Sequence, residues 1–131
     1  MFDLIDKQTK PKPKQRDQKY DYEKSYHNLT EIYLQMDSLS KAFPKNISVI
    51  TFGKSFENRE LKAIKIVAND SIKKRVVVFD CGIHAREWIS PAFCMWTIDR
   101  LITNSSLLES YDFLIVPVLN PDGYAMDTDL E

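Results

Sequence analysis

The run RVVVFDC at residues 75–81 is the feature that most limits the folds open to this chain. It is short, β-branched and nearly free of polar residues, which is typical of a strand buried on both faces of a sheet. A second run of the same kind, YDFLIVPVL, follows at residues 111–119. Together the two runs predict a sheet at the centre of an α/β domain.

Two segments have helical patterns, one before both runs and one between them. Apolar residues recur at helical spacing over residues 22–43, and we expect Pro44 to end that amphipathic helix. A more apolar helix is expected over residues 90–103, with Ser90 as its N-cap and Pro91 as its first helical residue.

The remaining elements are shorter. The runs at 47–52 and 61–67 predict a β-hairpin with Gly53 at its turn, and NPDG at 120–123 is a strong turn signal. The order helix, strand, strand, strand, helix, strand therefore indicates an α/β fold, a three-layer sandwich with a mixed β-sheet.

The start of the chain differs in composition from the rest. Residues 1–20 are basic and poor in apolar side chains, so we expect a disordered lead-in or linker before a folded domain at 21–131. A nucleic-acid or lipid-binding arm is the alternative. The net charge of −1 argues against nucleic acid as a partner, and no apolar stretch is long enough for a membrane span. The first residues do not form a secretory signal peptide.

The segment GIHAREW at 82–88 joins the first buried strand to the following helix. Sites in open α/β sheets form beyond the carboxyl ends of strands, so this connection is favourably placed. His84 and Glu87 are three residues apart, and an imidazole and a carboxylate are both good zinc ligands. The alternative is a loop histidine bonded to backbone and a carboxylate stabilised by the start of a helix. The spacing by itself leaves both interpretations open.

The wider segment DCGIHAREWISPAFC at 80–94 closely resembles the zinc-ligand segment of the A/B-type metallocarboxypeptidases, which remove single residues from peptide C-termini. GKSFENRELKAIKI at 53–66 resembles the hairpin before that site, and PVLNPDGYA at 117–125 resembles the strand and turn after it. QMDSLSKAFP at 35–44 is similar to the beginning of the catalytic domain. The resemblance covers roughly residues 22–125 and implies the N-terminal part of a carboxypeptidase-like fold, truncated.

The resemblance implies roles for individual residues. His84 and Glu87 match the first two zinc ligands, and Arg86 matches an arginine that helps to bind peptide substrate. For Arg86 the alternative is a surface arginine paired with a neighbouring acid. Arg59 matches an arginine of the hairpin with a structural role, and residues 120–123 match a turn that shapes the site without catalysing.

Cys81 and Cys94 match two positions that form a disulfide in B-type and related members, so the same bond is implied here. Two buried thiols in a reducing compartment are the alternative. A disulfide and four sequons together favour an extracellular, secreted setting. The sequons begin at Asn28, Asn46, Asn69 and Asn104.

In the family, the third zinc ligand, the general-base glutamate and the residues that bind the substrate carboxylate all lie downstream of NPDG. This chain ends at Glu131, so we expect two of the three protein ligands for Zn²⁺, no catalytic residue and no turnover by the chain alone. His27 belongs to the first helix and matches no ligand position. A sheet that stops early would also expose an edge, which predicts self-association.

Two functions of different kinds follow. The first is zinc-dependent hydrolysis of C-terminal residues, with peptide or protein C-termini as substrates and Zn²⁺ as cofactor. The second is a non-catalytic peptide-binding or interaction module derived from a carboxypeptidase, and a degenerate product without a role is a third interpretation. The choice between A-like and B-like specificity is open, because the residue that sets it is not in the sequence.

Overall fold

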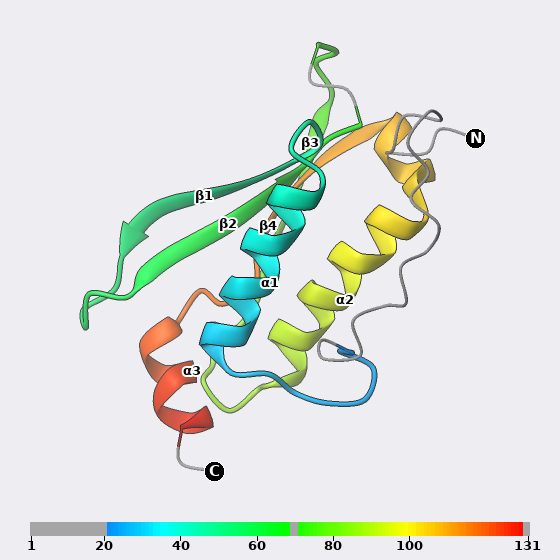
Figure 1. The fold of residues 1–131 in the computed structure, drawn as a ribbon. Helices are drawn as coiled ribbons and strands as arrows, with labels where there is room; N and C mark the ends of the chain where they lie inside the picture. The colour runs from blue at the N-terminus through cyan, green and yellow to red at the C-terminus, as the bar shows by residue number, and fades with distance from the viewer. Residues whose placement is uncertain (1–20, 69–70, 130–131) are drawn as a thin grey trace.

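The computed structural model describes residues 21–68 and 71–129, so the expected lead-in at 1–20 lies outside the described residues (Figure 1). The described residues form three α-helices, a short 3-10 helix and four strands. In chain order these are α1 (Leu29–Ala42), β1 (Ile47–Lys54), β2 (Glu60–Ile66), β3 (Arg75–Asp80), α2 (Ile89–Thr103), the 3-10 helix η3 (Ser105–Glu109), β4 (Tyr111–Val116) and α3 (Pro121–Thr128).

The four strands form one mixed sheet in the order β1-β2-β4-β3. β1 and β2 form the expected antiparallel hairpin, β2 pairs antiparallel with β4, and β3 pairs parallel with β4. The two near-continuous apolar runs of the sequence are thus β3 and β4, side by side. Because they are parallel, their carboxyl ends meet at the same edge of the sheet, where the chain leaves β3 for the 82–88 connection.

Helices α1 and α2 lie on one face of the sheet and cover it (Figure 1). The core forms between these helices and the strands. Four of its side chains are fully buried: Met36, Ile64, Ile98 and Ile115. Complete burial of one such side chain stabilises the fold by about 1.5–3 kcal/mol. The described residues therefore supply the sheet and one helical layer of the expected architecture.

The opposite face of the sheet is open in this structure. Val76 and Val78 of β3 are 54% and 61% exposed, whereas the alternate residues Val77 and Phe79 pack against the core. The expectation that residues 75–81 are buried on both faces is wrong for the described chain, because the helices cover only one side. Within the part of the chain that the structure describes, a helical layer thus covers one of the two apolar faces of β3.

Local signals misplaced several element boundaries. The first helix begins at Leu29 and not at Tyr22, because Asn28 and Glu31 form a reciprocal capping box there. Asn28 Oδ1 accepts a hydrogen bond from the Glu31 amide (3.0 Å), and Glu31 Oε2 accepts one from the Asn28 amide (3.2 Å). Gly53 lies at an irregularity in the pairing of β1, and the turn residue with a positive φ is Asn58 (65°).

The two later helices also differ from expectation. α2 begins at Ile89, and the Ser90 hydroxyl accepts a hydrogen bond from the Gly82 amide (3.0 Å) instead of capping the helix. NPDG is not a simple turn, since Asn120 is the N-cap of α3 and Pro121 its first residue. An Asn-Pro pair is also a helix-start signal, whereas Gly123 in the same motif is typical of a turn.

Candidate metal centre

The connection from β3 to α2 is attached to the segment that follows β4. The Cys81 amide donates to the Val116 carbonyl (2.9 Å), the Leu119 amide donates to the Cys81 carbonyl (2.8 Å), and the Asn120 amide donates to the Gly82 carbonyl (3.0 Å). These bonds continue the β3–β4 pairing beyond the end of the sheet. The first residues of the connection are therefore held in a defined position.

Gly82 allows the close approach of these two segments. Its φ of +67° lies in the left-handed region, where a side chain is strained. A Cβ there would lie 3.1 Å from the Pro117 carbonyl oxygen and 3.1 Å from the Val118 Cα. Any larger residue at position 82 would push the connection away from the segment after β4.

His84 and Glu87 follow within the same connection, and both are exposed to solvent. The Glu87 amide donates to the His84 carbonyl (3.3 Å), so a tight backbone turn joins the two residues. In the part of the chain that the structure describes, neither side chain makes a hydrogen bond or an ion pair. Their ring nitrogens and carboxylate oxygens are thus accessible to a ligand from solution.

No set of three or more His, Cys, Asp or Glu residues suited to a metal ion occurs within residues 21–68 and 71–129. His27, the other histidine, is buried with its Nδ1 3.2 Å from Glu31 Oε2 and its Nε2 3.3 Å from Ser25 Oγ. Its carbonyl oxygen accepts a hydrogen bond from the Tyr124 hydroxyl (2.6 Å), and burial raises the pKa of Tyr124 to about 12. His27 therefore has structural contacts at both ring nitrogens.

Cys81 and Cys94 form a disulfide, with 6.4 Å between their Cα atoms. Both residues are buried, at 6% and 0% exposure. The bond joins the last position of the β3 run to the second turn of α2, so it closes the covalent loop that contains His84 and Glu87. The pairing implied by the resemblance is thus present.

Arg86 is directed to the surface, with 91% of its side chain exposed. Its Nε lies 3.4 Å from Asp127 Oδ1, and the second oxygen of that carboxylate accepts a hydrogen bond from Trp88 Nε1 at 2.7 Å. Asp127 of α3 therefore contacts two residues of the connection. Asp127 was not among the residues singled out from the sequence, because no motif of the chain includes it.

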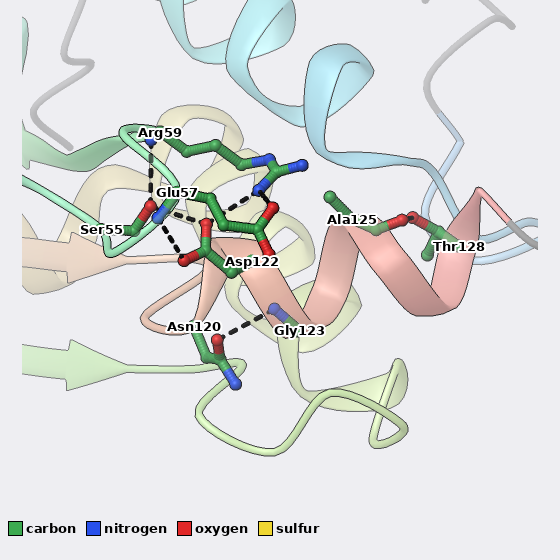
Figure 2. Close-up of polar contacts among 8 residues, drawn as sticks. All are labelled: Ser55, Glu57, Arg59, Asn120, Asp122, Gly123, Ala125 and Thr128. Carbon is green, nitrogen blue, oxygen red and sulfur yellow. Dashed lines mark hydrogen bonds and ion pairs between the residues drawn. The ribbon is translucent and has the colours of Figure 1, made fainter.

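A polar cluster attaches the β1–β2 hairpin to the first turn of α3 (Figure 2). Asp122 Oδ1 accepts from the Ser55 hydroxyl (2.6 Å) and from Arg59 Nη1 (2.9 Å), while Asp122 Oδ2 accepts from the Glu57 amide (3.0 Å). Arg59 Nη1 also donates to Glu57 Oε2. The structural interpretation of Arg59 agrees with this geometry, and the acceptor role of Asp122 was not foreseen.

The cluster shifts the pKa values of two of its members. The Ser55 hydroxyl, then the Glu57 amide and Arg59, lower the pKa of the Asp122 carboxyl below its ordinary value. Hydrogen bonds to Glu57 and to Asp122 raise the pKa of Arg59. Both shifts favour the charged form, so the ion pair between hairpin and helix is retained further toward acid and alkaline pH than for isolated groups.

The chain belongs to the zinc carboxypeptidase family, since the sequence profile of that family matches residues 32–129. Human carboxypeptidase B2 is 39% identical over 110 residues, which cover 79% of this chain and 26% of the human protein. The inactive metallocarboxypeptidase ECM14 of Saccharomyces cerevisiae is 40% identical over 110 residues, which cover 76% of this chain and 26% of the yeast protein.

Solved structures agree with this assignment. Bovine thrombin-activatable fibrinolysis inhibitor, in complex with tick carboxypeptidase inhibitor, superposes with a TM-score of 0.74 at 39% identity, over 82% of this chain and 36% of that chain. Carboxypeptidase A from Helicoverpa armigera superposes with a TM-score of 0.75 at 32% identity, over 82% and 27%. The fold is that of the carboxypeptidases, and this chain spans only 26–36% of the length of these relatives.

Proposed function

We propose that this chain supplies the first part of a zinc-dependent site for hydrolysis of C-terminal residues from peptides, with His84 and Glu87 as two of the zinc ligands. The observation that carries the proposal is their position. Both lie accessible on the connection beyond the carboxyl end of β3, beside the parallel strand β4, inside the segment that matches the family. This is where open α/β sheets bind their ligands.

The donor set fits zinc in kind but is incomplete in number. A neutral imidazole and a carboxylate are ordinary zinc ligands, and catalytic zinc sites commonly use three protein ligands with one open position for water. Bound zinc supplies Lewis-acid polarisation of a carbonyl and an activated water. The third ligand and a general base must therefore come from outside the described residues.

Arg86 is proposed to contact the peptide substrate. Arg86 is adjacent in sequence to Glu87, its side chain is 91% exposed, and its Nε lies 3.4 Å from Asp127 Oδ1. A guanidinium presents several N–H donors to carbonyl or carboxylate oxygens, so it suits the polar backbone of a peptide near its C-terminus. In this proposal Arg86 orients the peptide substrate and takes no part in the hydrolysis itself.

Titration with zinc, followed by competition with a chromophoric chelator, tests the ligand assignment. We expect weak binding of about one zinc ion per chain, because two donors hold the metal less firmly than three. His84→Ala and Glu87→Gln should each remove most of this binding. Glu109→Gln changes an exposed carboxylate on η3 and should leave it unchanged. Equal zinc binding by the His84→Ala variant would contradict the assignment.

We also propose that the chain by itself does not turn over peptide substrates. Incubation with zinc and peptides ending in Arg, Phe or Leu, followed by mass spectrometry, should show no release above a zinc-only blank. Zinc-dependent release that the His84→Ala substitution abolishes would show that the chain completes its own site, and the proposal of inactivity would be wrong.

A non-catalytic peptide-binding module is the second candidate, because the relatives that match this chain include an inactive metallocarboxypeptidase, at 40% identity. Such a module would bind a peptide with a free C-terminus in the presence of a metal chelator. An otherwise identical peptide amide is the matched control. Binding of the free acid that Arg86→Gln weakens, without any hydrolysis, would select this candidate over the first.

An extracellular setting is proposed from the disulfide, since such bonds persist in oxidising compartments. The helices in the described part of the chain are too short or too polar to cross a bilayer. Mass spectrometry of the protein from its native source, with free thiols alkylated before reduction, tests the setting. We expect Cys81 and Cys94 to remain unlabelled.

A further inference from the structure

Of the four sequons, those at Asn28, Asn46 and Asn104 lie in described residues, and the one at Asn69 lies outside them. An N-linked glycan is attached through the side-chain nitrogen of asparagine and replaces one of its two hydrogens, so the folded protein accommodates it without loss where that nitrogen makes no hydrogen bond. The structure gives Asn46 and Asn104 opposite environments in this respect.

The Asn46 side chain is part of the fold. Its Nδ2 donates to the Val67 carbonyl (3.0 Å) and to the Ala68 carbonyl (3.1 Å), while the Val67 amide donates back to the Asn46 carbonyl (2.9 Å). These three bonds join the start of β1 to the end of β2. A glycan on Nδ2 would replace one of its two hydrogens, break one of these bonds and leave a carbonyl unpaired.

The Asn104 side chain has no such role. Asn104 ends α2 through its backbone amide, which donates to the Arg100 carbonyl at 2.8 Å, and it makes no side-chain capping bond to η3. Its side chain forms no hydrogen bond with any residue that the structure describes. Asn104 is exposed, as is Ser106, the hydroxyl residue of the same sequon.

The position of Asn104 also separates it from the candidate metal centre. α2 runs away from the 82–88 connection, so its last residue lies at the opposite end of the molecule from that connection and α3 (Figure 1). A bulky glycan at this end leaves the approach to His84 and Glu87 open.

We propose that Asn104 carries an N-linked glycan and that Asn46 does not; this rests on the proposed extracellular setting. The donor would be an oligosaccharide linked to a lipid pyrophosphate. Asn104 Nδ2 forms a bond to the first carbon of the oligosaccharide, the bond from that carbon to the pyrophosphate oxygen breaks, the amide loses one proton and the lipid pyrophosphate leaves. No oxidation or reduction is involved.

The test is expression of the full chain behind a cleavable secretion signal in a eukaryotic host, with analysis of both cells and medium. Enzymatic deglycosylation in heavy-oxygen water marks each occupied asparagine for peptide mapping. The matched variants are Ser106→Ala and Ser48→Ala, which disable the sequons of Asn104 and Asn46 by the same change of side chain. Both serines are exposed.

We expect the heavy-oxygen mark on Asn104 and an unmodified Asn46. Ser106→Ala should lower the mass of the protein by one glycan, whereas Ser48→Ala should leave the glycan mass unchanged. A mark on Asn46, or an unmodified Asn104, would overturn the proposal. The assay needs neither zinc nor turnover, so its failure and the failure of the proposed metal site are separate results.

Discussion

Asn120 has two separate tasks at the base of the candidate metal centre. Its side-chain oxygen accepts from the Gly123 amide (3.0 Å) and caps α3, while its side-chain nitrogen donates to the Ile83 carbonyl (3.2 Å), one residue before His84. The family resemblance placed it in a shaping turn, which agrees with this geometry. The side chain can bond both α3 and the 82–88 connection only because β3 and β4 are neighbouring strands. The sequence does not predict that pairing.

Asn120→Asp separates these tasks, because a carboxylate still accepts the capping hydrogen bond but cannot donate to Ile83. We expect amide hydrogen exchange to become faster in the peptide covering residues 82–88 while α3 keeps its protection. Asn120→Ala, which loses both bonds, should accelerate exchange in both segments. Unchanged exchange at 82–88 in the aspartate variant would show that the Ile83 bond does not hold the loop.

The carboxyl of Asp122 gives a pH dependence with a definite sign. Its pKa is lowered in the folded state, so its contribution to stability is present above the ordinary carboxyl pKa of about 3.9 and is lost as the pH falls through the lower folded value. Asp122→Asn should therefore be less stable than the parent at about pH 6, with a smaller difference at about pH 2.5.

Urea unfolding at both pH values measures this difference. Glu109→Gln is the control, since Glu109 is an exposed carboxylate on η3 outside the cluster, and its effect should be small at either pH. A difference between parent and Asp122→Asn that stays constant with pH would mean that the charge of Asp122 does not stabilise the contact with the hairpin.

At the scale of elements, the sequence predicted strands more reliably than helix starts. The hairpin, β3 and β4 follow from apolar runs whose side chains enter the core. The start of α1 at Leu29 depends instead on the side-chain bonds of Asn28 and Glu31, which the apolar spacing of residues 22–43 does not reveal. Ser90 has a residue type that suits a cap, but its hydroxyl accepts from the Gly82 amide, eight residues earlier in the chain, and only the folded arrangement shows this.

The disulfide is the strongest single link between two elements. Replacing both Cys81 and Cys94 with Ala should lower the free energy of unfolding by about 3 kcal/mol, because the bond closes a short loop and restricts the unfolded chain. Denaturant unfolding under oxidising conditions measures this loss. A reducing agent should weaken the parent by a similar amount and leave the double variant unchanged; sensitivity of the double variant to the reductant would assign the effect to another cause.

At the scale of the molecule, the open face of the sheet is the feature that the sequence did not convey. The apolar pattern of β3 suits burial on both sides, yet helices cover one side of the described sheet, and Val76 and Val78 remain exposed on the other. β3 is also an edge strand of the sheet that the described residues form, so one side of it has no strand partner within residues 21–68 and 71–129. An apolar face beside such an edge favours contact with another protein surface.

We predict that the chain self-associates through this edge and face. Sedimentation velocity over a range of concentrations should show larger species at higher concentration, and Val78→Lys should shift the distribution toward monomer because it places a charge on the open face. Leu107→Lys is the control, since Leu107 is similarly exposed (55%) but lies on η3. Equal effects of both substitutions would refute a specific role for β3.

The attachments of the 82–88 connection also determine when it acquires its shape during synthesis. Gly82 is bonded to Asn120, the preceding Cys81 is bonded to Val116 and Leu119, and Arg86 and Trp88 contact Asp127, so all these partners are synthesised after the connection. On a ribosome, this connection can adopt its folded conformation once residue 127 has left the exit tunnel. Since chains fold from the N-terminal side as they emerge, the loop that carries the proposed zinc ligands would acquire its shape only after α3 has been made.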